Sequence, residues 1–156
     1  MPIAPKKVFL TKGQVAWVDA EDFDRVSQYK WHAVWIKHNR TWIARRGSRP
    51  QMLMSRFILG ITDPNIPVDH KNHDTLNNQK YNLRVANHSQ NSRNTRKHSN
   101  NKSGFKGVCL RGEKWCVQIA VDGKRIQKYG FKTAEEAYEV YKSIALEHHG
   151  EFACLE

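Results

Sequence analysis

Short β-rich runs separated by turn residues dominate the first sixty positions of the chain. The apolar runs 8–10 and 15–18 are separated by Lys-Gly-Gln at 12–14, which predicts a β-hairpin. Asp19 is a candidate cap for a short helix that extends to about Tyr29, with acidic residues in its first turn. The start of the chain therefore predicts a hairpin followed by a helix.

The apolar pattern then predicts more strands and a second short helix. Residues 31–36 and 41–45 have strand-like composition and are joined by a polar turn. A turn at 47–50 precedes the stretch 52–59, in which apolar residues recur at roughly helical spacing. Gly60, directly after this stretch, is typical of a helix C-cap.

Regular alternation returns in the last third of the chain. Three strands are predicted at about 105–111, 114–121 and 125–131, joined by two-residue hairpin turns. Thr133 and Glu136 have the spacing of a capping box, which begins an amphipathic helix that runs to about His148. This pattern predicts a three-stranded antiparallel sheet packed on one helix.

The middle of the chain, 61–104, is poor in large apolar side chains and rich in Asn, His, Asp and basic residues. Such a segment cannot build a conventional core, so either it is disordered or its polar groups organise a site. Its last part, 98–103, has the composition of a flexible linker. We therefore predict an α+β protein. Its expected parts are a domain at 1–97 (a β-rich part at 1–60 and a polar part at 61–97), a linker at 98–103 and a domain at 104–156.

The charge of the chain points to a polyanionic partner. Lys and Arg number 26 against 15 Asp and Glu, a formal charge of +11 in 156 residues, and nucleic acid is the usual partner of such a chain. Residues 105–132 hold 7 basic and 2 acidic side chains, whereas 133–156 hold 1 and 6. A basic sheet facing a phosphate backbone, with an acidic helix turned away from it, explains this switch. The alternative is a solvated surface with accidental clustering.

Composition also excludes several classes of protein. Nothing approaches the roughly 18 apolar residues that a membrane span needs, and the first residues form no apolar signal core. Cys109, Cys116 and Cys154 are an odd number without a Cys-x-x-Cys pair, which argues against a disulfide scaffold and a structural zinc site. We expect a cytoplasmic protein with no membrane partner.

Four polar residues in the middle segment suit the chemistry of phosphodiester hydrolysis. A base must take a proton from water, and the histidine pKa near 6.5 makes His70 the natural candidate. A hard cation must neutralise charge on the phosphate, and carboxylate and carboxamide oxygens such as those of Asp69 and Asn91 are suitable ligands. Asn82 lies between these positions. A purely structural polar loop is the alternative interpretation.

With Asn82 and Asn91 included, this set resembles the HNH endonuclease family and its ββα-metal motif. The resemblance lies in Val-Asp-His at 68–70, Tyr-Asn-Leu-Arg at 81–84 and Gln-Asn at 90–91. It is greatest to phage and bacterial homing endonucleases with Asn in the last motif position. Residues 8–60 also resemble the leader region of that phage family, which often has His where this chain has Ser55.

The resemblance implies a role for each motif residue. His70 is implied to be the general base, and Asp69 and Asn91 are implied to bind a divalent ion, Mg²⁺ in the first place and Mn²⁺ as the alternative. The residue matching Asn82 ties the loop together by hydrogen bonds, and we group it with His70 as a catalytic candidate. The implied products carry 5′-phosphate and 3′-hydroxyl ends.

Residues 104–153 resemble the AP2 DNA-binding domain. The matching pieces include Gly-Phe-Lys-Gly-Val at 104–108, Lys-Trp at 114–115 and Gly-Lys-Arg at 123–125. The AP2 domain lays its three-stranded sheet in the DNA major groove. The resemblance and the basic run from 84 to 102 together yield these DNA-contact candidates: Arg84, Arg93, Arg96, Lys97, Lys106, Arg111, Trp115, Arg125 and Lys128. Trp115 is equally a candidate for the core.

These observations predict a metal-dependent DNA endonuclease of the homing type, with site selection aided by the AP2-like domain. Its expected partner is double-stranded DNA, which it nicks or cuts, and we expect a monomer or a weak dimer. It would act in the cytoplasm of a bacterium or of a phage-infected host. Two alternatives stay open, namely a DNA-binding regulator whose HNH fold no longer cuts, and a protein that binds or cuts RNA.

Overall fold

The computed structural model describes residues 4–47, 50–98 and 100–155. Contacts divide the chain into a first unit that ends at Asn87 and a second unit that begins at His88. This division precedes the linker predicted at 98–103. The predicted turn at 47–50 and that linker include residues 48, 49 and 99, which lie outside the described residues.

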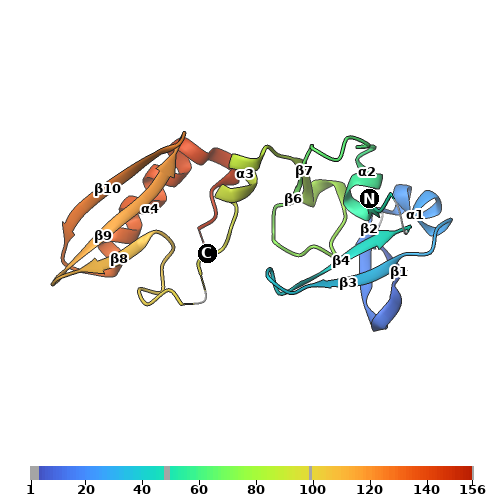
Figure 1. Cartoon of the computed structure of the whole chain (residues 1–156), viewed down its shortest axis with the longest axis horizontal. Helices are drawn as coiled ribbons and strands as arrows, with labels where there is room; N and C mark the ends of the chain where they lie inside the picture. The colour runs from blue at the N-terminus through green and yellow to red at the C-terminus, as the bar shows by residue number, and fades with distance from the viewer. Residues whose placement is uncertain (1–3, 48–49, 99, 156) are drawn as a thin grey trace. The chain divides into compact units, whose positions relative to one another are not determined.

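The first unit combines three small antiparallel sheets with short helices, which agrees with the predicted α+β class (Figure 1). Its sheets pair β1 with β2, β3 with β4 and β5, and β6 with β7. In chain order its elements are β1 (Lys6–Phe9), η1 (Thr11–Gly13), β2 (Val15–Val18), α1 (Ala20–Ser27), β3 (His32–Ile36), β4 (Thr41–Arg46), β5 (Met52–Leu53), α2 (Met54–Ile58), β6 (Val68–His70), η2 (Lys80–Asn82) and β7 (Leu83–Val85).

One apolar core holds the first unit together. Val26, Trp31 and Met54 are completely or almost completely buried in it. The Trp31 indole Nε1 donates a hydrogen bond to the carbonyl oxygen of Val26 at 2.9 Å, so the polar hydrogen of this buried ring has a partner. The stretch predicted as a helix at 52–59 is a short strand followed by α2. Gly60, with a φ of +69°, follows in the left-handed conformation typical of helix ends.

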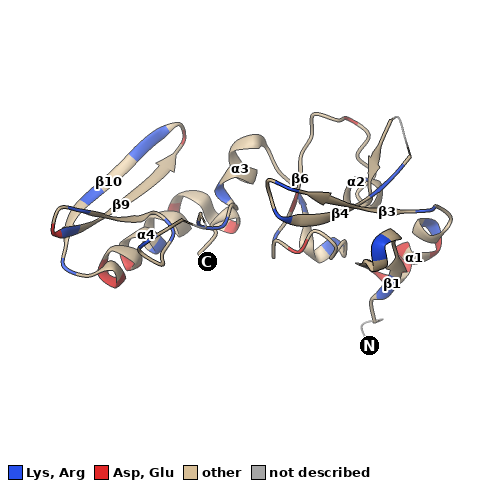
Figure 2. Cartoon of the chain, turned by 60° about the horizontal axis from the view of Figure 1, so that its bottom comes forward, with Lys and Arg blue, Asp and Glu red and all other residues tan. Residues whose placement is uncertain are grey.

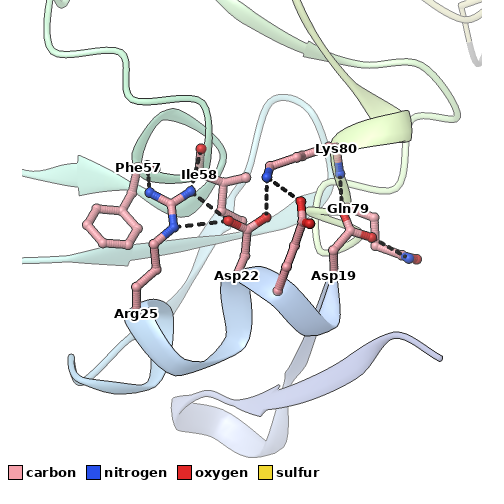
Figure 3. Close-up of polar contacts among 8 residues, drawn as sticks. Asp19, Asp22, Arg25, Phe57, Ile58, Gln79 and Lys80 are labelled. Carbon is pink, nitrogen blue, oxygen red and sulfur yellow. Dashed lines mark hydrogen bonds and ion pairs between the residues drawn. The ribbon is translucent and has the colours of Figure 1, made fainter. Parts of the chain in front are cut away.

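A network of ion pairs and hydrogen bonds joins α1 to α2 and to the turn η2 (Figure 3). The buried carboxylate of Asp22 accepts a hydrogen bond from Arg25 at 2.7 Å and lies 3.3 Å from the Lys80 ammonium. Arg25 also donates to the carbonyl oxygen of Ile58 at 2.6 Å. Because Asp22 has two cationic partners, its burial does not leave an uncompensated charge.

Asp19 has a different role from the predicted helix cap. It occupies the N-cap position of α1, but its side chain makes no cap hydrogen bond. Its carboxylate instead accepts hydrogen bonds from the Gln79 side chain at 3.0 Å and from the backbone N–H of Lys80 at 2.7 Å (Figure 3). Asp19 therefore anchors the turn η2, which leads directly into Asn82 and β7.

The second unit contains the sheet and helix predicted for the end of the chain. Its elements, in chain order, are α3 (His88–Arg93), β8 (Val108–Arg111), β9 (Lys114–Val121), β10 (Lys124–Phe131), α4 (Ala134–His149) and η3 (Gly150–Phe152). The sheet is antiparallel with strand order β10-β9-β8. The predicted cap of the long helix is confirmed, because the Thr133 side chain accepts a hydrogen bond from the Glu136 N–H at 3.1 Å.

The register divides the side chains of this sheet between two faces. Val117 and Ile119 pack in the core with Ala137 and Tyr141 of α4. Since side chains alternate along a strand and paired residues share a face, alternate residues point away from α4. We call this second side the open face, and it carries residues 109, 111, 114, 116, 118, 120, 125, 127 and 129.

Charge is segregated between the sheet and the helix. Figure 2 shows basic residues on β10 and acidic residues on α4. This arrangement agrees with the charge switch seen in the sequence between 105–132 and 133–156. Within the described part of the chain, no helix has both the length and the apolar character that crossing a membrane requires.

Candidate functional site

Asp69 is held in β6 by a buried ion pair. It lies directly opposite Arg84 of β7 in the strand register, and both side chains are about 8% exposed. Arg84 Nε donates to Asp69 Oδ2 at 2.8 Å, and the Nη2 atom of Arg84 lies 2.6 Å from the same oxygen. A carboxylate has four lone-pair sites, so this pairing is compatible with a further cationic partner.

The position of Arg84 bears on its predicted contact with DNA. A phosphate contact needs an exposed cation, whereas the Arg84 guanidinium is buried against Asp69. The structure therefore assigns Arg84 to the support of Asp69 and removes it from the DNA-contact candidates.

His70, the last residue of β6, has its tautomer set by Asn78. The Asn78 amide nitrogen faces the carbonyl oxygens of Thr75 and Leu76, at 3.4 and 3.2 Å, which leaves Asn78 Oδ1 to face His70 Nε2 at 3.3 Å. Because Oδ1 is an acceptor, Nε2 carries the hydrogen of the neutral ring. Nδ1 is then the basic nitrogen of His70.

Burial lowers the pKa of His70 from its usual value. The hydrogen bond with Asn78 and the carboxylates of Asp69 and Asp74 act in the opposite direction, but their effects are smaller. The ring is thus held in the neutral form that accepts a proton.

A small cavity of about 140 Å³ lies beside His70 within the first unit. Ile43, Leu53 and Val68 contribute apolar walls, and Thr75 and Asn78 contribute polar groups. Ser55, the position at which the resembled family often has His, is buried and also lines this cavity. The space next to His70 suits water better than a nucleotide.

Asn82 connects the two ends of the loop between β6 and β7. Its side chain donates to the carbonyl oxygen of Asn77 at 2.7 Å and accepts from the N–H of Asn72 at 3.0 Å. Its backbone carbonyl accepts from the N–H of Lys71 at 2.9 Å. The Asn82 side chain is 1% exposed, and its bonds keep the loop closed next to Asp69 and His70.

The same loop is held against the edge of β2. The Trp17 N–H donates to the carbonyl oxygen of Leu76 at 2.8 Å, and the Asn78 N–H donates to the carbonyl oxygen of Trp17 at 2.7 Å. These bonds fix Asn78 and thus the ring of His70. The sequence alone did not indicate the contact of Asn78 with His70 or the ion pair of Arg84 with Asp69. Both contacts are seen only once the chain is folded.

Asn91 lies on α3, in the second unit, whereas Asp69, His70 and Asn82 lie in the first. The structure brings the last three together, and the convergence of Asn91 with them stays a prediction. Within residues 4–47, 50–98 and 100–155, no three His, Cys, Asp or Glu side chains are grouped to hold a metal ion.

The DNA-contact candidates of the second unit fall into separate groups. Arg111 and Arg125 lie on the open face of the sheet. Lys128 pairs with Val117 and Trp115 packs against the core cluster, so these two lie on the face that carries α4. For Trp115 the structure supports the core alternative. The remaining candidates line one cavity together with Arg125, namely Arg93, Arg96, Lys97 and Lys106.

Comparison with known proteins identifies a viral relative. A protein of Acanthamoeba polyphaga mimivirus, named as an uncharacterized HNH endonuclease, is 30% identical to this chain over 142 residues. The match covers 91% of this chain and 74% of the relative. No protein-family model matches the chain, and no solved structure matches it.

Proposed function

Because the chain belongs to the HNH endonuclease family, we propose that it is a metal-dependent DNA endonuclease that hydrolyses phosphodiester bonds. The observation that carries the proposal is the placement of His70. Its ring is oriented by Asn78, lies beside a cavity of about 140 Å³ and is close enough to the buried carboxylate of Asp69 to be affected by its charge. This is the arrangement expected of a general base next to a cation ligand.

The chain's own residues have distinct roles in this proposal. His70 takes a proton from the attacking water on Nδ1, and Asn78 holds the Nε2 hydrogen so that the ring presents that nitrogen. Arg84 keeps the carboxylate of Asp69 in place, and Asn82 keeps the loop closed. General-base catalysis of this kind contributes about 10²–10⁴-fold to a rate.

The donor set fits a hard divalent ion. Asp69 and Asn91 offer a carboxylate and a carboxamide oxygen, the ligand types that Mg²⁺ prefers, with Mn²⁺ as the alternative. When bound, such an ion neutralises charge on the phosphate and on the leaving oxygen. The family resemblance implies products that keep the phosphate on the 5′ end and a hydroxyl on the 3′ end.

The second unit supplies DNA binding in this proposal. Its AP2-like sheet has basic residues on the open face, among them Arg111 and Arg125, with the acidic helix on the other face. We assign to this unit the selection of the cleavage site in double-stranded DNA. A single motif of this kind acts on one strand at a time, so nicking is the simplest expected outcome.

Incubation of supercoiled plasmid with the full chain tests the proposal. We expect nicked or linear DNA with Mg²⁺ and none with EDTA, and Asp69→Asn should reduce the rate by at least about tenfold. A DNA ligase should reseal the nicks without prior phosphorylation if the ends are as proposed. Binding without cleavage at any Mg²⁺ or Mn²⁺ concentration would instead identify a regulator with an inactive HNH fold.

A further inference from the structure

Two of the three cysteines lie side by side on the open face of the sheet. Cys109 of β8 is directly opposite Cys116 of β9 in the strand register, and their Sγ atoms are 2.7 Å apart. Cys116 Sγ also donates a hydrogen bond to the carbonyl oxygen of Cys109 at 3.1 Å. Both are free thiols. Neither belongs to the apolar cluster between the sheet and α4, so the packing of that core does not explain the pair.

The positions of these two residues permit a disulfide bond. Residues directly opposite each other in an antiparallel pair have Cα atoms about 4.5–5.5 Å apart, within the range of about 4.4–6.8 Å found for disulfide-linked cysteines. Because the sulfur atoms are already in contact, a bond of about 2.05 Å needs only a small rotation of the side chains. The two thiols can therefore be linked without a rearrangement of the sheet.

The two sulfur atoms differ in exposure. Cys109 is partly exposed and lines a cavity of about 640 Å³, which a small oxidant can enter, whereas Cys116 is completely buried. Burial, and next the contact with Cys109, raise the pKa of the Cys116 thiol, and the charge of Arg111 acts in the opposite direction with a smaller effect. Because accessible thiols are oxidised first, Cys109 is the expected site of attack and Cys116 the resolving thiol.

From this geometry we propose that Cys109 and Cys116 form an oxidation site, which hydrogen peroxide converts into a reversible disulfide bond. The Cys109 thiolate attacks one peroxide oxygen, so that an S–O bond forms, the O–O bond breaks, and the departing hydroxide takes up the thiol proton as water. The Cys116 thiolate then attacks the Cys109 sulfur, and the S–O bond breaks with loss of a second water. The two thiols lose two electrons and two protons, and one peroxide gains them as it becomes two waters.

Two features make this disulfide easy to reduce. It closes a short loop, from 109 to 116, so it gains little stability by restricting the unfolded chain. One of its sulfur atoms belongs to the partly exposed Cys109, where an external thiol can attack. Disulfide formation also keeps Cys109 from further oxidation to sulfinic acid, which a dithiol does not reverse. The pair is therefore suited to a reversible modification rather than to a structural cross-link.

Peroxide treatment of the full chain without DNA tests the proposal. A slight molar excess of hydrogen peroxide should lower the number of titratable thiols from three to one, and a dithiol should restore all three. Tryptic digestion of the oxidised chain should yield the peptides 107–111 and 115–124 joined by a disulfide. The absence of this linked pair, a link from Cys109 to Cys154, or a link between two chains as the main product would overturn the proposal.

Two matched variants test the role of Cys116. In Cys116→Ala the oxidised Cys109 has no resolving partner. Trapping of its sulfenic acid by dimedone should therefore rise at least about tenfold over the wild type, since an adjacent thiol reacts far faster than a probe in solution. Cys154→Ala removes a buried cysteine outside the pair, and it should form the disulfide as the wild type does. Equal trapping in the wild type and in Cys116→Ala would contradict the resolving role. None of these readouts involves DNA, so their failure is distinct from failure of the nuclease proposal.

Discussion

Replacing His70 with alanine is expected to slow DNA cleavage by about 10²–10⁴-fold, the usual contribution of a general base. His70 is the residue whose ring is oriented by Asn78 and which lies beside the small cavity of the first unit. Without the imidazole, the proposed acceptor for the proton of the attacking water is lost. Cleavage of supercoiled plasmid under single-turnover conditions measures this loss.

Two controls separate loss of the general base from loss of DNA binding and from a nonspecific effect of the substitution. DNA binding by His70→Ala, measured in EDTA, should stay within about twofold of the wild type, because the ring is not among the proposed DNA contacts. His38, an exposed residue in the turn between β3 and β4, offers a histidine with no role in the proposed site, and His38→Ala should cleave at nearly the normal rate. If His70→Ala cleaves as fast as His38→Ala, another residue is the base.

Gly107→Ala is expected to destabilise the second unit by about 3 kcal/mol or more. A Cβ at this position would lie 2.3 Å from ring carbons of Tyr141 and 2.8 Å from the carbonyl oxygen of Gln118. Tyr141 is buried in the core and cannot move aside, and Gly107 has a φ of +70°, which itself disfavours a side chain. Native-state hydrogen exchange of the β9 amides in the full chain, measured at increasing denaturant, reports the effect on the second unit.

Gly123 in the β9–β10 turn provides the matched control. It has a similar φ of +77°, but a Cβ there would meet nothing within 4 Å. Gly123→Ala therefore incurs only the backbone cost of about 1–2 kcal/mol. Equal destabilisation by both variants would show that the close approach to Tyr141 is not what requires glycine at 107.

The parts of the fold that depend on local pattern could be predicted from the sequence. The strand expected at 114–121 is β9 (Lys114–Val121), and the helix begins after the predicted cap Thr133. Alternation and capping involve residues within a few positions of each other, so one sequence suffices to recognise them. The motif glycine at 107 similarly marks a place where no side chain fits.

The environment of the candidate site could be predicted only in part. Asp69, His70 and Asn82 were identified as candidates, but β6 and β7 have three residues each and depend on the loop that pairs with Trp17. That pairing joins segments about sixty positions apart in the chain, and no local periodicity indicates it.

Charge alone does not separate a DNA contact from a structural ion pair. Arg84 was grouped with the DNA contacts because it is basic, whereas the fold pairs it with Asp69 in the interior. Asp19 was interpreted as a cap because of its position, yet its partners are Gln79 and Lys80. In both cases the partner is distant in sequence. The amino-acid sequence alone therefore does not show whether such a charged residue makes the predicted contact or a structural ion pair or hydrogen bond.

In the proposed function, Asp69, Asn91 and His70 gather around one divalent ion. Crystals of the full chain grown with Mn²⁺, with data collected at the manganese absorption edge, test it most directly. The proposal predicts an anomalous peak within coordination distance of both a carboxylate oxygen of Asp69 and Asn91 Oδ1, with the His70 ring beside it. A peak elsewhere, or Asp69 and Asn91 too far apart to share one ion, would contradict it.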